Sequence, residues 1–508
     1  MESFQSILLG FSVALTPVNL FYAFTGCLVG TVIGVLPGLG PLCTIAMILP
    51  VTFSMNPISA MIMMAAVYYG AQYGGSITAI LLNIPGESAS VMTCIDGYQM
   101  ARQGRAGIAL AMSAIGSFIA GTLSVVGLML MAPPLAKIAL KFGPPEYFSL
   151  MLLGLSTVVF LGGSSILKSL ISIVMGLLLG MVGVDPVGGI NRYTLGQLEL
   201  LDGVNFIVVV MGLFGIGEVL VSAEERMKIN IIKTKLSELI PKLKDWKESA
   251  GPIIRGSLIG FFLGVLPGTG ATISSFLSYA TEKMISKNPE KFGKGAIEGV
   301  AGPEAANNAA VGGTLVPLFT LGIPGSGTTA VMMGVMMMFG LRPGPLLFIQ
   351  HPDFVWGIIA SMYIGNVILL IMNLPLIPLF ASILRVPYSI LYPFILLICF
   401  TGVYSLENSM FHVFMMFIFG IIGYVIKKTD FPPAPIVLAL ILGPMVERAL
   451  YQSLTISHGN LGILFTRPFS AAFLVLVFIL LLVPLARWWY GRSKQISLHK
   501  INRKVEDS

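Results

Sequence analysis

Residues 26–40, GCLVGTVIGVLPGLG, return later in the chain as residues 256–270, GSLIGFFLGVLPGTG. Both stretches carry three glycines at intervals of four and end in Val-Leu-Pro-Gly-x-Gly, and every matched position is displaced by 230 residues. Proline removes a backbone donor and glycine permits positive φ angles, so a helix that reaches this motif has to break. The sequence therefore predicts the same broken-helix element twice.

A second motif is repeated in the same order. Gly74-Gly75 and Ile84-Pro85-Gly86 correspond to Gly312-Gly313 and Ile323-Pro324-Gly325, at offsets of 238 and 239. A longer charged loop in the second copy accounts for the larger offset, because insertions fall in loops. We therefore predict two homologous halves, with an internal repeat at an offset of about 230 residues.

The composition around these motifs is that of a membrane protein. Of the 508 residues, 56% are hydrophobic and 10% are charged, with a mean hydropathy of +0.89, whereas a soluble domain carries about 25% charged residues. Apolar runs recur that are long enough, at roughly 20 residues, to cross a hydrocarbon layer of about 30 Å as a helix. Runs such as Phe469 to Val483 lack the alternation of a membrane barrel.

We predict an all-α polytopic membrane protein with about 11–14 membrane segments, including broken or re-entrant helices. The candidate segments are 20–36, 57–82, 106–131, 147–165, 168–184, 204–221, 253–281, 303–323, 326–349, 355–383, 388–406, 410–427, 432–446 and 469–490. Residues 1–16 have Glu2 and no Lys or Arg ahead of their apolar stretch, so we expect no cleaved export signal.

Basic residues concentrate in loops and divide the chain. We predict a first repeat half at 1–222, a basic cytoplasmic linker at 223–252, a second half with additional C-terminal helices at 253–490, and a basic C-terminal tail at 491–508. Basic residues near membrane ends are retained in the cytoplasm, and no aromatic or motif support for nucleic-acid binding accompanies them.

One further basic loop, Lys283 to Lys294, conflicts with a simple count of crossings. A single span between it and the linker would place two basic loops on opposite sides of the membrane. We therefore favour a re-entrant hairpin that turns at Pro267-Gly268-Thr269-Gly270, because non-helical backbone is tolerated at membrane depth where it lines a cavity.

Catalytic and metal chemistry find no support in the residue types. The four cysteines, Cys27, Cys43, Cys94 and Cys399, form no CxxC pair, and no two of the four histidines stand at metal-ligand spacing. We expect no catalytic residues, no metal site and no cofactor, and hence not an enzyme.

The broken helices are the candidate binding site. Half-helix N-termini carry a partial positive charge that suits an anion, and freed carbonyls suit a cation. Hydroxyls and amides gather here without a fixed positive charge. The predicted substrate-binding residues are Gly38, Gly40, Pro85, Gly86, Ser88, Ser90, Gly268, Gly270, Pro324, Gly325, Ser326, Thr328 and Thr329.

Alternatives for some of these residues remain open. The glycines at intervals of four, Gly26, Gly30, Gly256 and Gly260, are typical of close helix packing. Ser326, Thr328 and Thr329 could cap the next helix, and capping does not exclude binding.

Oxygen-bearing side chains of the same region suit a coupling ion, Na⁺ or H⁺. We assign Glu304, Asn307, Asn308 and Asn83 to this role, because ionisable groups inside the membrane usually mark ion or substrate pathways. Other acidic residues are expected to be structural. Glu87 and Asp96 are placed in a surface loop with Arg102 and Arg105, and Glu447 is paired with Arg448. Asp185, Asp202 and Glu218 receive no assignment.

Long, ordered motifs now point to a family. They are 83–90 with Asp96-Gly-Tyr98, 303–308, 321–330, 342–345, 442–447 and 466–468. Over nearly its whole length the chain resembles the large membrane subunit of tripartite tricarboxylate transporters, the TctA family.

The resemblance implies a secondary active transporter permease in the bacterial cytoplasmic (inner) membrane. It implies import of a small organic di- or tricarboxylate driven by a Na⁺ or H⁺ gradient, a small membrane subunit as partner, and an extracytoplasmic solute-binding protein that delivers substrate. An ion channel or another non-tripartite membrane transporter is the alternative. Alternating access at a central site is expected, by elevator or rocking motion.

Overall fold

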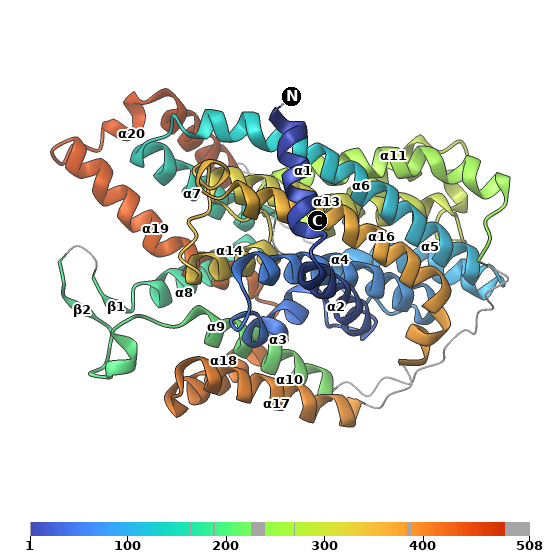
Figure 1. Ribbon diagram of the computed structural model, residues 1–508, viewed down its shortest axis with the longest axis horizontal. Helices are drawn as coiled ribbons and strands as arrows, with labels where there is room; N and C mark the ends of the chain where they lie inside the picture. The colour runs from blue at the N-terminus through green and yellow to red at the C-terminus, as the bar shows by residue number, and fades with distance from the viewer. Residues whose placement is uncertain are drawn as a thin grey trace, which may run out of the picture.

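The computed structural model describes residues 2–161, 165–185, 188–224, 239–268, 270–383 and 388–482, which are helical almost throughout (Figure 1). The tail and residues 225–238 of the linker lie outside the described residues. The helices are α1 (Glu2–Ala14), α2 (Pro17–Gly34), α3 (Pro41–Thr52), α4 (Pro57–Leu82), α5 (Val91–Arg102), α6 (Ala106–Ala139), α7 (Pro144–Leu161), α8 (Ile166–Gly180), α9 (Phe206–Val210), α10 (Gly217–Glu224), α11 (Leu243–Val265), α12 (Gly270–Ile285), α13 (Glu298–Leu321), α14 (Gly327–Met338), α15 (Leu347–Gln350), α16 (Pro352–Ile383), α17 (Tyr388–Glu407), α18 (Met410–Lys428), α19 (Ala434–Ile456) and α20 (Ile463–Thr466).

Short elements complete the chain. A π-helical segment, Met211–Ile216, joins α9 to α10, and 3-10 turns occupy Ser88–Ser90, Leu198–Leu200 and Pro289–Lys291. Strands β1 (Gly183–Val184) and β2 (Asn191–Arg192) pair antiparallel in a small hairpin that projects from one end of the molecule (Figure 1).

The all-α polytopic architecture is confirmed. Six of the described helices are long and apolar enough to cross a membrane, and shorter apolar helices such as α3, α8 and α14 accompany them. Large apolar side chains lie exposed on the outer helices, including Leu130, Phe262 and Phe414. Apolar side chains on the outside suit lipid as the surrounding solvent.

Some predicted segments were wrong in detail. α3 and α5 were not predicted as helices, and the segment 326–349 is the shorter α14, followed by a turn. α3 and α14 have 12 residues each, which is about 18 Å of helix and too little to cross a hydrocarbon layer of about 30 Å. They are two of the helices that follow the Pro-Gly breaks, and α5 and α12 are the other two.

The predicted turn near residue 267 is confirmed as a hairpin. α11 ends at Val265 and α12 begins at Gly270. Arg255 on α11 donates to Glu282 on α12 from Nε at 2.8 Å and from Nη2 at 2.6 Å. The far end of α12 therefore lies back beside α11, so the span predicted at 253–281 doubles back instead of crossing.

Glycine ladders hold the long helices of each half together. A Cβ on Gly26, Gly30 or Gly34 of α2 would come within 2.5, 2.6 or 2.4 Å of a carbonyl oxygen of α4. The carbonyls are those of Met63, Val67 and Ala71. The backbones of α2 and α4 touch directly, and both helices run in the same direction. The packing role expected for Gly26 and Gly30 is confirmed.

The second half has the same ladder. A Cβ on Gly256, Gly260 or Gly264 of α11 would lie 2.3, 2.1 or 2.5 Å from a carbonyl oxygen of α13. These carbonyls belong to Gly302, Ala306 and Ala310, each 239 positions after its counterpart on α4. The element orders α2–α3–α4–α5 and α11–α12–α13–α14 correspond, while the homology of the halves stays a prediction.

The corresponding long helices of the two halves run in opposite directions. Ser76 of α4 donates to Glu304 of α13. Tyr68, eight positions earlier on α4, contacts Ser326, whose neighbour Gly325 packs against Thr314 of α13. α4 is therefore antiparallel to α13, and α2 is antiparallel to α11. The sequence had left open whether the arrangement is inverted or parallel, and the structure has it inverted.

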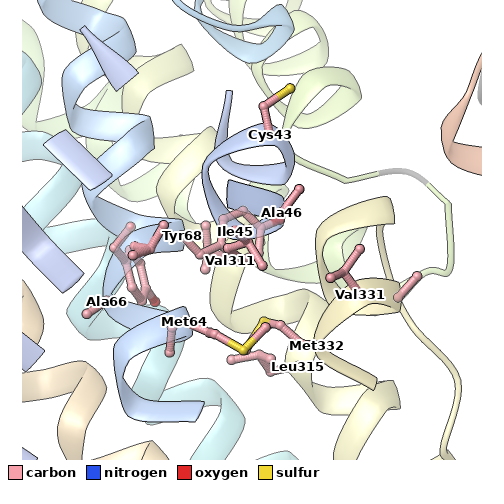
Figure 2. Packing of buried hydrophobic residues seen from close by; sticks show 14 of the residues in the cluster. Cys43, Ile45, Ala46, Met64, Ala66, Tyr68, Val311, Leu315, Val331 and Met332 are labelled. Atoms are coloured by element: carbon pink, nitrogen blue, oxygen red, sulfur yellow. The ribbon is translucent and has the colours of Figure 1, made fainter. Parts of the chain in front are cut away.

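The half-helices pack in the centre against these long helices. In Figure 2, Ile45 of α3, Tyr68 of α4 and Val311 of α13 lie in one group, with Met332 of α14 below them. All four side chains are buried. Helices α9, α10, α17 and α18 form a further layer along the lower edge of Figure 1.

Candidate functional site

The two breaks of each half are tied to each other by the backbone. The amide of Gly38 donates to the carbonyl of Gly86 at 3.1 Å, and the amide of Gly268 donates to that of Gly325 at 2.9 Å. Gly38 and Gly268 have φ angles of +84° and +85°, which favour glycine. Each half thus presents a pair of joined turns in the protein interior.

A cavity of about 700 Å³ lies where these turns meet. Eight predicted substrate-binding residues line it, namely Gly38, Gly40, Pro85, Ser88, Gly268, Gly270, Ser326 and Thr328. The other five, Gly86, Ser90, Pro324, Gly325 and Thr329, do not line it and belong to the turns and caps behind its wall. The structure therefore brings the four motifs together at one place.

Helix N-termini point at this cavity from both halves. Its wall includes the first residues of α3, α12 and α14 and those of the 3-10 turn that leads into α5. Gly40 caps α3 without a side-chain hydrogen bond, and Pro41 follows it. Uncapped amides and aligned peptide dipoles at helix starts attract negative charge.

Hydroxyl groups join the halves across the cavity. The hydroxyls of Ser88 and Thr272 lie 2.8 Å apart and share a hydrogen bond. The hydroxyl of Tyr68 lies 3.3 Å from that of Ser326. Ser326 also accepts from the amide of Thr329 at 3.2 Å while the Thr329 hydroxyl accepts from the amide of Ser326 at 2.8 Å. The capping alternative for Ser326 is confirmed as a reciprocal capping box.

Glu304 occupies a separate, fully buried position on α13. Its carboxylate accepts hydrogen bonds from Ser76 on α4, from Thr93 on α5 and, at 3.2 Å, from Ser113 on α6. Three hydroxyl donors from three other helices stabilise negative charge at this site. None of these partners carries a positive charge.

Asn307 and Asn308 lie one turn along α13 and are also buried. Asn308 Nδ2 donates to Ser117 at 2.8 Å and to Asn307 Oδ1 at 2.5 Å. Asn308 Oδ1 and Asn307 Nδ2 have no hydrogen-bond partner in the part of the chain that the structure describes. Buried polar atoms without partners are costly, so these two mark a place where a ligand could complete the bonding.

The structure places Asn83 elsewhere. It ends α4 in the left-handed conformation, with φ of 59°, and its side chain is exposed. The helix residue that contacts Glu304 is Ser76, seven positions earlier, or about 10 Å along the axis. Asn83 caps the end of α4 in the same way as Gly322, with φ of 68°, caps the end of α13.

Sequence reasoning missed several cavity residues. Tyr68, Gln72, Glu87, Glu218 and Lys427 all line the cavity. Lys427 forms an ion pair with Glu218, so the expectation of a site without fixed positive charge was wrong. Lys427 follows an apolar run at a helix end, where a basic residue is also typical of a membrane boundary.

The surface assignment of Glu87 was also wrong. Glu87 lies in the cavity wall next to Gly40, whose added Cβ would be 3.2 Å from the Glu87 Cβ. Glu87 Oε1 is buried without a hydrogen-bond partner among the described residues.

Asp96 is not a surface residue either. It is fully buried on α5, where it accepts from the Tyr279 hydroxyl at 2.8 Å. It also accepts from the amides of Gly293, Gly295 and Ala296 at 2.9, 2.8 and 2.8 Å. The side chain therefore fastens the loop before α13 to the first half.

A second cavity, of about 610 Å³, lies farther along α14 and α19. Gly334 and Met338 of α14 line it, whereas Gly327 and Thr328 line the first cavity. Arg192 stands in its wall and contacts Asp185 at 2.9 Å and Glu447 at 2.6 Å. The expected pairing of Glu447 with Arg448 was wrong, since Arg192 of the β-hairpin takes that place.

Comparison with known proteins identifies the family. The family model of the tripartite tricarboxylate transporter TctA family matches residues 20–438, a range that contains both sets of turns and Lys427. An Agrobacterium vitis protein, described as an uncharacterized 52.8 kDa protein in the TAR-I ttuC' 3' region, is 48% identical over 474 residues, 93% of this chain and 94% of the relative.

A second Agrobacterium vitis relative, described as an uncharacterized protein in the TAR-II ttuC' 3' region, is 45% identical over 226 residues. That alignment covers 44% of this chain and 93% of the relative. No solved structure matches. The match over residues 20–438 shows that this multi-pass membrane chain belongs to the tripartite tricarboxylate transporter TctA family.

Proposed function

We propose that this chain is the permease subunit of a secondary active transporter that imports a small organic di- or tricarboxylate. In this proposal it works in the bacterial cytoplasmic membrane with a small membrane subunit and an extracytoplasmic solute-binding protein. A Na⁺ or H⁺ gradient drives uptake, and no other cofactor takes part. Membership of the TctA family supports the assignment.

One observation supports the assignment of the substrate site to this cavity. The N-terminal ends of α3, α12, α14 and the turn before α5 converge on the cavity of about 700 Å³. Each end contributes amide donors and part of a positive dipole, which is how broken helices in transporters hold anions. The hydroxyls of Ser88, Ser326 and Thr328 supply further donors. A carboxylate is the small, rigid acceptor that such a donor set fits.

The coupling ion is assigned to the buried group around Glu304. A buried carboxylate whose described partners carry no positive charge and the unpartnered oxygen of Asn308 together suit Na⁺ or a proton. Ser113 of α6 and Glu304 of α13 share this site, so occupancy of the site stabilises the contact between two long helices. Asn83, at the far end of α4, has no part in this assignment.

The two cavities suggest a path for the substrate. The first lies beside Glu218 of α10, the helix that leads to the basic linker, which we place in the cytoplasm. The second lies beside the β-hairpin at the other end of α14 and α19. In the proposed cycle, substrate enters from the second side, binds between the Pro-Gly turns in the first cavity and leaves from there to the cytoplasm.

Gradient-driven uptake tests the function. The chain is reconstituted in proteoliposomes with its small subunit and binding protein, and uptake of radiolabelled citrate, malate and succinate is followed under a Na⁺ or a H⁺ gradient. Uptake of at least one of these that collapses with the gradient supports the proposal. Ser326→Ala and Thr328→Ala should each reduce it, whereas Thr401→Ala, an exposed threonine of α17, should not.

Two results would contradict the proposal. Ion current that flows without any of these substrates would indicate a channel. Normal uptake by the combined Ser326→Ala, Thr328→Ala and Asn307→Ala variant would show that the sites are misplaced.

A further inference from the structure

The ion pair between Glu218 and Lys427 joins two helices outside the two repeated units. Glu218 stands at the start of α10, and Lys427 stands near the end of α18. The helices come close because Gly217 faces Gly423, and a Cβ on Gly217 would lie 3.2 Å from the Gly423 Cα. Lys427 is one helical turn beyond Gly423, which brings its ammonium to the Glu218 carboxylate.

The pair forms part of the wall of the central cavity. A Cβ on Gly38 would lie 2.8 Å from Glu218 Oε1, so the carboxylate lies against the first Pro-Gly turn. Lys427 is the sole lysine or arginine among the described residues that line this cavity. The Glu218 side chain is 4% exposed and that of Lys427 is 30% exposed. The anion of the pair is thus enclosed, while the cation keeps free surface.

The free surface of Lys427 matters because a lysine ammonium has three donors in a flexible geometry. One donor can stay with Glu218 while another reaches a guest in the cavity. Helix N-termini supply only partial charges of roughly half a unit each, whereas a di- or tricarboxylate brings two or three full negative charges. The cavity needs a full counter-charge, and Lys427 is the residue that can provide it.

We propose that Lys427 receives a carboxylate of the transported anion and that Glu218 holds Lys427 in place while the cavity is empty. This inference rests on the proposed function and names the residue that recognises the charge. Glu218 also sets an upper limit to affinity, because its own charge competes for the ammonium. A transporter needs such a limit, since a substrate that binds too tightly is not released.

Charge variants separate this role from a purely structural one. The full-length protein in lipid nanodiscs is titrated with citrate and with succinate by calorimetry at constant salt. Lys427→Gln should raise the Kd for citrate at least about tenfold, equivalent to ~1.4 kcal/mol. Glu218→Gln should instead lower that Kd, because it frees the ammonium. If the ion pair were purely structural, both substitutions should change the Kd for citrate in the same direction.

The neighbouring lysine is the matched control. Lys428 ion-pairs with Glu224 at 2.6 Å and does not line the cavity. Lys428→Gln removes the same charge from the same helix, so its Kd for citrate should stay at the wild-type value. An equal loss of affinity in Lys428→Gln and Lys427→Gln would overturn the inference, because it would reflect net charge alone.

Lys427→Gln alone could fail to fold, because it leaves Glu218 unpaired. The double variant with Glu218→Gln and Lys427→Gln keeps the test valid in that case. Glu218→Gln and the double variant both lack the enclosed negative charge and differ only in Lys427. The double variant should bind citrate at least about tenfold more weakly than Glu218→Gln. Equal affinity in these two proteins overturns the role of Lys427. Absence of carboxylate binding or uptake by the wild-type protein would overturn the proposed function itself.

Discussion

The amide of Gly268 donates a hydrogen bond to the carbonyl of Gly325 at 2.9 Å, so the break between α11 and α12 is fastened to the break between α13 and α14. The contact between Gly38 and Gly86 does the same in the first half. The position of the proposed substrate site depends on these two contacts, because each holds two helix starts at the cavity.

Gly325→Ala should destabilise the protein. A Cβ there would lie 2.7 Å from the Thr314 Cα and 3.0 Å from the Gly264 oxygen, and overpacking of this kind costs about 1–3 kcal/mol. Thermal unfolding in nanodiscs measures the loss. Gly365→Ala is the control, since its Cβ would meet only the Cys27 sulfur at 3.8 Å. An unchanged melting temperature in Gly325→Ala would show that the turn has room to adjust.

Ser88→Ala should weaken transport without weakening the fold. The Ser88 hydroxyl is exposed to the cavity and bonds Thr272 at 2.8 Å, and a hydrogen bond to a charged ligand contributes about 1.5–3 kcal/mol. The KM for uptake should rise about tenfold or more, while the melting temperature should stay within about a degree of the wild type, because substitutions at exposed positions change stability little. A lower melting temperature with an unchanged KM would assign Ser88 to structure alone.

Glu304→Gln should uncouple uptake from its driving ion. Glutamine keeps the shape but removes the charge that Ser76, Thr93 and Ser113 surround. We expect gradient-driven uptake to be lost while exchange of labelled for unlabelled substrate continues, because exchange needs no net movement of the ion. Proteoliposome uptake and counterflow measure the two processes. Glu290→Gln, in an exposed 3-10 turn, should leave both unchanged. Full gradient-driven uptake by Glu304→Gln would exclude Glu304 as the coupling residue.

Asp96→Ala should be among the more damaging substitutions in the protein. It would leave three backbone amides and the Tyr279 hydroxyl without their acceptor, and each unsatisfied buried donor costs about 1–3 kcal/mol. Tyr279→Phe removes one of the four donors and should cost about 1 kcal/mol. Thermal unfolding compares both with Asp353→Asn, an exposed residue. A smaller loss of stability for Asp96→Ala than for Tyr279→Phe would contradict the role of Asp96 in holding the loop before α13.

Much of the fold could be predicted from the sequence because its signals are local. The break at Pro267-Gly268 follows from proline and glycine alone, and the repeated spacing predicted where its counterpart would lie. The relative direction of the halves could not be predicted in this way. It depends on contacts such as Tyr68 with Ser326, whose positions differ by 258 residues.

The meeting of the four motifs at one cavity could be predicted from the sequence, whereas the distant side chains that complete the cavity wall could not. Gly38, Gly268 and Ser326 belong to motifs, so their neighbourhood could be inferred. The polar stretch around Glu87 and Asp96 predicts surface residues, because α5, which buries Asp96, mixes its apolar residues with polar ones such as Gln99 and Arg102. Lys427 reaches the cavity only because α18 packs on α10.

The glycine ladders have a consequence for movement. At Gly260, backbone meets backbone so closely that no side chain separates α11 from α13, and a shift of one helix along the other would drive Cα atoms into carbonyl oxygens. The α2–α4 pair and the α11–α13 pair should therefore each move as a rigid unit. Any rearrangement that carries a guest from one side of the membrane to the other has to take place at joints outside these two pairs, where side chains rather than peptide groups are in contact.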